Sequence, residues 1–285
     1  MKIIFDEAAT RYGNSEHPER PERLLTTVPH LRKALPQLVW ERPFAAEDKA
    51  LLLAHDGVHL ARLRQPVDFD SDTPYYTDID QHARRAAGGA LLAVESARKG
   101  ESAFSLLRPP GHHAKRAQAM GFCYLNSIAA AALNALNDGC ERVAIWDFDA
   151  HHGNGTEAIV SGNERILFAS VHQYPGYPGT GTHSFQNILN WPVPPMTDSE
   201  MHAAKVKEAL DRLVAFQPDL LLVSAGFDAY LNDPITNLRL EAEHFYRFGT
   251  WLREINIPAA AILEGGYSAE LPELIESFIR GWTAD

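Results

Sequence analysis

The sequence has few cysteines and no long apolar segment. Only Cys123 and Cys140 occur among 285 residues, too few for the disulfide framework of a small secreted protein, so we expect a reducing, cytoplasmic setting. No apolar run approaches the roughly 20 residues that a membrane-spanning helix needs, so no membrane partner is expected. The first ten residues, MKIIFDEAAT, hold one lysine, a short apolar start and then acid, which is not the pattern of a signal peptide.

Basic residues are in the minority. Lys and Arg number 26 against 37 Asp and Glu, which gives a formal net charge of −11. Because an acidic protein is repelled by the phosphate backbone, nucleic acid is not expected as a direct partner. The sequence has no internal repeat, low-complexity tract or convincing linker, and its 45% apolar residues suffice for a sizeable core. We therefore expect one domain over residues 1–285, and the sequence makes no prediction about oligomeric state.

Short apolar runs alternate with longer segments whose apolar residues recur at helical spacing. This alternation is typical of strands joined by helical crossovers, and it predicts an α/β fold with a mainly parallel, multi-stranded sheet flanked by helices. The expected strands are Ile3–Phe5, Ala103–Leu107, Val143–Trp146, Ile166–Ser170, Leu220–Ser224 and Ala259–Leu263. The expected helices are Ala83–Arg98, Leu125–Leu136, Met201–Phe216 and Glu241–Glu254. Asp68–Tyr76 and Trp191–Pro195 are expected to be long surface loops.

Polar residues follow five of these apolar runs. The segments are RPPGHH (108–113), DFDAHHGNG (147–155), SVH (170–172), SAGFD (224–228) and EGGY (264–267). In an open parallel sheet, ligands bind beyond the carboxyl ends of the strands. The sequence therefore predicts a functional site at this edge of the sheet.

Asp149, His151 and Asp228 are candidate metal ligands. Asp149 and His151 are two residues apart, so on an extended segment both side chains point to the same side. Asp228 follows a different strand, and two carboxylates with one imidazole leave one position open, as in catalytic zinc sites. Asp147 shares that face, but a third carboxylate would over-neutralise a divalent ion, so we expect it to have a separate role. The alternative is that the Asp-x-Asp-x-His pattern only caps a strand-to-helix turn.

Taken together, these segments resemble the arginase–deacetylase superfamily and, within it, the zinc-dependent histone deacetylase family. Six motifs occur in the family's order: HPERPERL (17–24), RPPGHHA (108–114), GFCYLN (121–126), DFDAHHGNGT (147–156), SAGFD (224–228) and EGGY (264–267). Their variants resemble the class II and bacterial members, which include amidohydrolases. The resemblance covers most of the chain.

The resemblance implies roles for the residues of these motifs. The zinc ligands would be Asp149, His151 and Asp228, and a potassium ion would bind Asp147, Asp149, His151, Ser170 and Val171. The tandem histidines would be His112, held by Asp147, and the proton-shuttling His113, while Tyr267 would donate a hydrogen bond to the reacting acyl oxygen. Asn154 stands where class I enzymes carry an aspartate behind the second histidine, and this predicts a lower pKa for His113.

The resemblance also implies a narrow tunnel for an acylated side chain. Phe122 would form one wall, the Gly121 carbonyl would accept the substrate amide proton, and Tyr177 matches the opposite wall, on a shorter loop than in the animal enzymes. Asp72 aligns with the family's rim aspartate. Arg23 is expected to face the inner end of the tunnel.

The implied reaction is zinc-dependent hydrolysis of an N-acyl amide, with an acylated lysine peptide or protein as the expected substrate. An acetylpolyamine or small acetylated metabolite is the alternative, although the apolar Ile235 replaces the glutamate of polyamine-selective class II relatives. A manganese ureohydrolase or a non-enzymatic acyl-lysine binder would fit the motifs less well. His55 and His59, at helical spacing, are expected on a helix face near the rim, with a surface metal pair as the alternative.

Overall fold

The computed structural model describes residues 1–283 of the chain. Eight strands form one sheet in the order β2-β1-β3-β8-β7-β4-β5-β6, and every neighbouring pair is parallel. The strands are β1 (Lys2–Ile4), β2 (Val39–Glu41), β3 (Ala103–Ser105), β4 (Val143–Asp147), β5 (Ile166–Gln173), β6 (Ile188–Val193), β7 (Leu220–Ala225) and β8 (Ala259–Leu263). The predicted α/β fold with a parallel sheet is confirmed.

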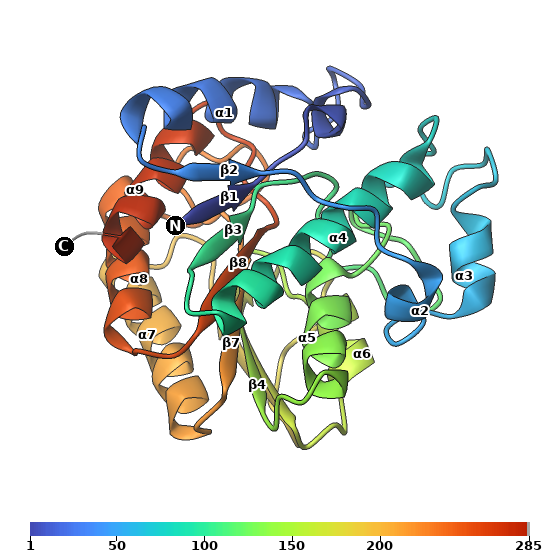
Figure 1. Cartoon of the computed structure of the whole chain (residues 1–285). Coiled ribbons are helices and arrows are strands. Elements are labelled where there is room, and N and C mark those ends of the chain that lie inside the picture. The colour runs from blue at the N-terminus through green and yellow to red at the C-terminus, as the bar shows by residue number, and fades with distance from the viewer. Residues whose placement is uncertain (284–285) are drawn as a thin grey trace.

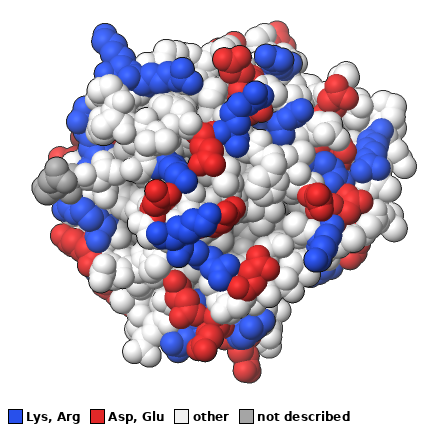
Figure 2. All heavy atoms as spheres, viewed as in Figure 1, with Lys and Arg blue, Asp and Glu red and all other residues white. Residues whose placement is uncertain are grey.

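Helices cover both faces of the sheet. They are α1 (Glu22–Ala34), α2 (Asp48–Leu51), α3 (Gly57–Arg62), α4 (Ile79–Arg98), α5 (Ser127–Asn137), α6 (Asn154–Val160), α7 (Ser199–Ala215), α8 (Ala242–Glu254) and α9 (Leu271–Thr283), with a 3-10 turn, η1, at Glu7–Thr10. Figure 1 shows α4, α5 and α6 on one side of the sheet and α1, α9, α8 and α7 on the other. Basic and acidic side chains are interspersed over the face seen in Figure 2.

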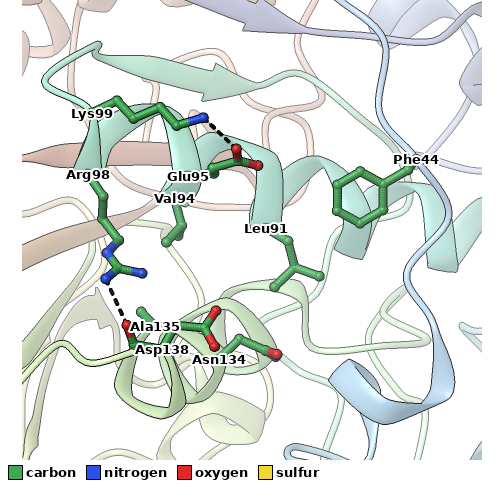
Figure 3. Close-up of a pocket in the computed structure, with 9 residues that line it drawn as sticks. All are labelled: Phe44, Leu91, Val94, Glu95, Arg98, Lys99, Asn134, Ala135 and Asp138. Carbon is green, nitrogen blue, oxygen red and sulfur yellow. Dashed lines mark hydrogen bonds and ion pairs between the residues drawn. The ribbon is translucent and has the colours of Figure 1, made fainter.

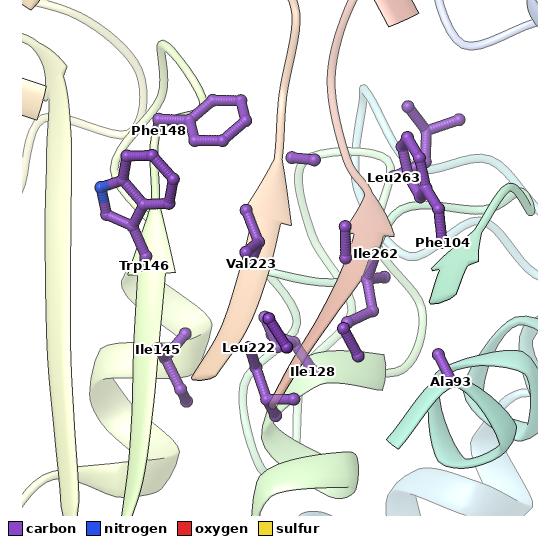
Figure 4. Packing of buried hydrophobic residues seen from close by; sticks show 14 of the residues in the cluster. Ala93, Phe104, Ile128, Ile145, Trp146, Phe148, Leu222, Val223, Ile262 and Leu263 are labelled. Carbon is purple, nitrogen blue, oxygen red and sulfur yellow. The ribbon is translucent and has the colours of Figure 1, made fainter. Parts of the chain in front are cut away.

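The central strands are apolar because both of their faces are covered. Every residue of β4, β7 and β8 is buried, which is why their sequences are continuous rather than alternating. Figure 4 shows Ile145, Leu222 and Ile262 on these neighbouring strands, within one hydrophobic cluster. Among residues 1–283, no helix is both long enough and apolar enough to cross a bilayer.

Close packing of α4 explains two of its glycines. A side chain on Gly88 would collide with the backbone carbonyl of Phe44, and one on Gly89 would collide with Leu107. The helix therefore approaches its neighbours more closely than any larger residue allows, and this holds it beside β3 and the segment that follows β3.

The prediction of a loop at Trp191–Pro195 is wrong for its first half. Residues 188–193 form β6, which pairs in parallel with β5 and places Pro192 opposite His172. Proline disguises this strand, yet it is tolerated there because β6 is at the edge of the sheet, where one row of backbone groups has no partner strand. Asp68–Tyr76 lies outside the helices and strands, as predicted.

Candidate active site

The carboxyl ends of five adjacent strands bring the polar segments together. The order β3-β8-β7-β4-β5 places the residues after β3, β8 and β7 beside those after β4. In the register, Asp147 pairs with Ser224 on one side and with Ser170 on the other. Segments that are more than 100 residues apart in the chain thus meet, since the Gly265 N–H donates to Asp149 Oδ2 at 2.7 Å.

Asp149, His151 and Asp228 form a compact set of donors. One ligand atom from each lies within 4.8 Å of the others, and His151 Nδ1 is 2.8 Å from Asp228 Oδ2 and 3.2 Å from Asp149 Oδ1. Both carboxylates are fully buried. A side chain on Gly265 would overlap both carboxylates, so glycine is required for this close approach.

This donor set fits a divalent cation. Burial acts to lower the pKa of His151, but the carboxylates of Asp228 and Asp149 outweigh it and raise that pKa to about 10. Burial together with the neighbouring Asp149 raises the pKa of Asp228. The two buried carboxylates therefore favour a positive charge beside them. A proton on His151 supplies one such charge, and a bound divalent metal ion would supply two. Two carboxylates and one imidazole with a further position open match catalytic zinc.

His112 and His113 have opposite environments. His112 Nδ1 donates to Asp147 Oδ2 at 3.0 Å; burial opposes its charge, but Asp149 and Asp147 raise its pKa well above the usual value. His113 Nδ1 is 2.7 Å from Asn154 Oδ1, and burial, with His112 and His151 nearby, lowers its pKa well below the usual value. When the pKa values of two neighbouring groups are shifted in opposite directions, one group can act as an acid and the other as a base. Here His112 favours the protonated form and His113 the neutral form.

Asn154 fixes the tautomer of His113. It is the first residue of α6, and because a carbonyl oxygen only accepts, Nδ1 of His113 must carry the proton and Nε2 is left free to accept one. The low pKa of His113 comes from burial and the neighbouring histidines, whereas the hydrogen bond to Asn154 acts to raise it; that an aspartate would raise this pKa further stays a prediction.

Tyr267 is held from both sides. Its N–H donates to Asp233 Oδ2 at 2.8 Å, and the guanidinium of Arg23 lies 4.9 Å from the ring centre. Desolvation raises the pKa of its phenol well above the usual value, so the hydroxyl stays protonated and can donate a hydrogen bond. Arg23 is buried against Tyr267, but it is not among the residues that line the cavity, so its position at the inner end of a tunnel stays a prediction.

His113, His151 and Tyr267 line one cavity of about 320 Å³. Its walls are formed by His17, Pro18, Ser71, Asp72, His113, Gly121, Phe122, His151, Tyr177, Ile235 and Tyr267. All four predicted substrate-binding residues are among them. Tyr177 packs edge-on against His113 with ring centres 5.1 Å apart, and a side chain on Gly121, whose φ is +58°, would overlap His113. A residue larger than glycine at position 121 would therefore collide with His113 and Tyr177.

The residues of the predicted potassium site are neighbours. Asp147 is fully buried, its Oδ1 accepts from the Asp149 N–H at 3.1 Å, and Ser170 pairs with it across β4 and β5. Ser170 Oγ is 2.9 Å from His172 Nδ1. Potassium binding itself stays a prediction.

His152 turns away from the metal ligands. Its Nδ1 is 2.8 Å from Thr180 Oγ1 and its Nε2 is 3.0 Å from Glu157 Oε2. It therefore does not extend the donor set toward a second metal ion, which a ureohydrolase of the same superfamily would need.

The prediction for His55 and His59 is wrong. Both are buried, and α2 ends at Leu51 while α3 begins at Gly57, so they do not share a helix. His55 Nε2 accepts from the Asn126 N–H at 2.8 Å, and His59 Nε2 donates to the Tyr124 carbonyl at 2.8 Å. These two histidines thus form hydrogen bonds with the backbone of the GFCYLN segment. Their spacing in the sequence could not show this, because their partners are more than 60 residues away.

Several buried charged residues were not predicted as part of the site. Arg108 donates to both carboxylate oxygens of Glu19, with Nη2 2.7 Å from Oε2, and Arg23 Nη1 is 3.3 Å from Glu19 Oε1. Glu264 accepts backbone hydrogen bonds from the segment that carries His112. The available signal was position: each stands inside one of the six motifs, beside a predicted site residue.

A second cavity, of about 480 Å³, lies between α4 and α5. Figure 3 shows Leu91, Val94 and Phe44 along it, with Lys99 paired to Glu95 and Arg98 donating to the carbonyl of Asp138. It is larger than the cavity at Tyr267, but its Lys99 and Glu95 are paired with each other and no histidine lines it. Volume alone does not identify the site in this protein.

Comparisons with known proteins agree on one family. The model of the histone deacetylase domain matches residues 17–281. An uncharacterised protein from Synechocystis sp. is 40% identical over 98% of this chain and 97% of its own length, and a probable deacetylase from Archaeoglobus fulgidus is 37% identical over 94% of this chain and 81% of its own length.

Two crystal structures are similar over 100% of this chain. They are the HDA15 HD domain, with a TM-score of 0.92, 30% identity and 91% of that chain covered, and acetylpolyamine aminohydrolase from Burkholderia pseudomallei, with a TM-score of 0.91, 27% identity and 99% covered. With the family model matching residues 17–281, the chain belongs to the histone deacetylase family.

Proposed function

We propose that this protein is a zinc-dependent deacetylase that hydrolyses the N-acyl amide of an acylated amine. The observation that carries the proposal is the convergence of Asp149, His151 and Asp228, with donor atoms within 4.8 Å of one another, beside a cavity that His151, His113 and Tyr267 line. A zinc ion held there would supply Lewis acidity, which polarises an acyl carbonyl and lowers the pKa of water from about 15.7 toward 7.

We assign the proton transfers to His113. It is buried and neutral, its Nδ1 proton is engaged by Asn154 at 2.7 Å, and its Nε2 is therefore free to accept a proton from water and to deliver it to the departing amine. His112, paired with Asp147 at 3.0 Å, carries positive charge and stabilises negative charge that develops on the acyl oxygen.

Tyr267 is assigned to that developing negative charge as a hydrogen-bond donor. Removing one such donor typically lowers kcat by about 10²–10³-fold. Arg23 and Asp233 keep the tyrosine in place through its ring and its N–H. Asp147, Asp149, His151, Ser170 and Val171 are proposed to bind potassium, which would stabilise the end of β4 beneath the histidines.

We favour the side-chain amine of acyl-lysine as the substrate amine. Gly121, Phe122 and Tyr177 line the cavity with largely apolar atoms, which suits an unbranched acylated chain, and the exposed Asp72, which also lines it, suits a substrate backbone N–H or ammonium. Ile235, another residue of its lining, offers no charge to the internal ammonium of a polyamine.

An acetylated polyamine is the second candidate, because a structural relative is an acetylpolyamine aminohydrolase. Asp72 lines the cavity and is exposed, and Asp70 lies two residues before it, so acidic side chains lie at the mouth and would attract cations. With an acetylated polyamine, free ammonium groups of the substrate would lie at this acidic mouth. With an acyl-lysine peptide, the peptide backbone would lie there.

The test is a panel of acetyl-lysine peptides, longer acyl-lysine peptides and acetylpolyamines with the zinc-loaded protein. We expect turnover of acyl-lysine peptides, a kcat about 10²–10³-fold lower for Tyr267→Phe with zinc retained, and no change for Tyr246→Phe, an exposed tyrosine on α8. Faster turnover of acetylpolyamines would replace lysine by polyamine as the substrate class. Absence of turnover on every acyl amide, with one zinc bound per chain, would refute the proposal.

A further inference from the structure

We propose that Glu264 is a positioning residue that fixes the backbone of the His112–His113 segment relative to Tyr267. The inference rests on the proposed function in one respect, because it takes His113 and Tyr267 as the groups that must be aligned. Glu264 itself faces backbone groups rather than the cavity.

The carboxylate of Glu264 holds the histidine segment directly. It is fully buried at the end of β8, and its Oε2 accepts the Gly111 N–H at 2.7 Å and the His112 N–H at 3.1 Å. Its Oε1 is 3.3 Å from Ser224 Oγ, which donates to it from β7. One side chain thus joins three strand ends: those of β3, β7 and β8.

The carbonyl of the same residue, His112, is held by α6. The His112 carbonyl accepts the N–H groups of Gly155 and Thr156, both at 3.0 Å. A side chain on Gly155 would overlap the His113 backbone, so the first turn of α6 lies against the segment. Both backbone groups of His112 are therefore hydrogen-bonded: α6 holds its carbonyl and Glu264 holds its N–H. Of these two contacts, the one from Glu264 connects His112 to the segment that carries Tyr267.

The residues that follow Glu264 are fixed just as closely. The Gly265 N–H donates to Asp149 at 2.7 Å, the Gly266 carbonyl accepts from Arg23 Nε at 2.7 Å, and the Tyr267 N–H donates to Asp233 at 2.8 Å. The Glu264–Tyr267 segment therefore ties a metal ligand and the tyrosine to a backbone that Glu264 ties to the histidines. Removal of this link would let the two halves of the site shift relative to each other.

Reach rather than charge is what the contacts require of residue 264. A single oxygen, Oε2, accepts both N–H groups, and the other oxygen faces a hydroxyl. The amide of glutamine meets the same demands, since its carbonyl can accept both N–H groups and its NH₂ can donate to Ser224 Oγ. Aspartate keeps the charge but is one methylene too short.

The experiment compares Glu264→Gln with Glu264→Asp in the full chain. For the zinc-loaded enzyme we expect kcat within about threefold of wild type for the Gln variant and about 10–100-fold lower for the Asp variant, with KM changed less, because a misplaced catalytic group costs mainly rate. In a His113→Ala background the Asp substitution should cause no further loss, since groups that act as a unit are non-additive.

A second readout does not depend on activity. Hydrogen exchange of the Gly111 and His112 amides in metal-free protein should be at least about tenfold faster in the Asp variant and unchanged in the Gln variant. Ile262→Ala, which removes a buried side chain from the same strand, is the matched control: it should lower thermal stability without selectively exposing these amides.

The reverse ranking would overturn the proposal. If Glu264→Asp keeps kcat and amide protection while Glu264→Gln loses them, the charge of Glu264 matters and not its reach. If both variants keep the kcat and the amide protection of the wild type, Glu264 does not position the His112–His113 segment. If wild-type enzyme hydrolyses no acyl amide, the proposed function fails, whereas the exchange comparison still decides whether Glu264 holds the segment.

Discussion

The middles and the carboxyl ends of the same strands are equally buried and chemically opposite. Ile145, Leu222 and Ala261 lie in the middle of β4, β7 and β8, and Asp149, Asp228 and Glu264 follow those strands; all six are 0% exposed. Burial of an aliphatic side chain stabilises the fold by about 1.5–3 kcal/mol. Buried carboxylates stabilise nothing by themselves and must each be paired.

Each carboxylate at the strand ends is in fact engaged. Asp149 accepts from Gly265, Asp228 accepts from the Ala150 N–H at 2.8 Å, and Glu264 accepts from Gly111. This edge of the sheet is therefore organised for reactivity. The stability of the fold comes from the apolar middles of the same strands. Substitutions in the two regions should therefore separate activity from stability.

The largest effect is expected from Asp149→Ala, at the carboxyl end. Loss of a metal-ligating carboxylate should lower kcat/KM by at least about 10⁴-fold, which corresponds to about 5.4 kcal/mol in the barrier. Steady-state kinetics with excess zinc measure this. A variant that retains more than a tenth of the activity would show that Asp149 is not a ligand.

The opposite change is Phe248→Ala, in the apolar region. Phe248 on α8 is fully buried against Phe148, with ring centres 5.3 Å apart, and its truncation should lower the free energy of unfolding by about 3–5 kcal/mol. Urea unfolding measures the loss. The specific activity of the folded fraction should stay within about threefold, and an inactive but fully stable variant would contradict the separation of the two regions.

Acid should destabilise the fold through buried neutral histidines. Burial lowers the pKa of His55, His172 and His202 to about 3 each, whereas the unfolded chain protonates them near pH 6.5. Between pH 6.5 and 3 the unfolded state binds more protons, so stability falls as pH falls, by up to about 1.4 kcal/mol per pH unit for each histidine.

His202→Leu provides the matched control. Among residues 1–283, neither ring nitrogen of His202 has a hydrogen-bond partner, so leucine removes a titratable group without breaking a hydrogen bond. The slope of unfolding free energy against pH should drop by about 1.4 kcal/mol per pH unit. An unchanged slope would mean that His202 titrates alike in the folded and unfolded states.

The smallest effect is expected from Asn154→Asp. A carboxylate 2.7 Å from His113 Nδ1 favours the imidazolium, so the pKa of His113 should rise by about one unit or more, about 1.4 kcal/mol. Because the base must be neutral, the acid limb of the pH profile of kcat/KM should move to higher pH. A profile that does not move would show that Asn154 does not influence the proton transfers.

The sequence predicted the edge that carries the site because local patterns encode it. Val143–Trp146 and Ala259–Leu263 are apolar runs followed at once by ionisable residues, and parallel strands end at a common edge. The strands β2 and β6 were not predicted, since β2 is an edge strand with no buried residue and β6 contains Pro192.

Long-range pairing was out of reach of the sequence. Arg108 and Glu19 are 89 residues apart, and Glu264 and Gly111 are 153 apart, so no local periodicity announces that they touch. His55 and His59 show the converse error: their spacing suggested one helix face near the rim, but His55 lies between α2 and α3, only His59 lies in α3, and both rings are buried.

Whether Asp149, His151 and Asp228 form a single metal site is measured by metal binding to wild-type and Asp228→Asn protein. After removal of metal, titration with zinc should show one equivalent bound per chain and a rise in the unfolding temperature, because a ligand that binds only the folded state stabilises it. Asp228→Asn should lose both. Two equivalents of manganese in wild type, or undiminished zinc binding by Asp228→Asn, would contradict a single site made by Asp149, His151 and Asp228.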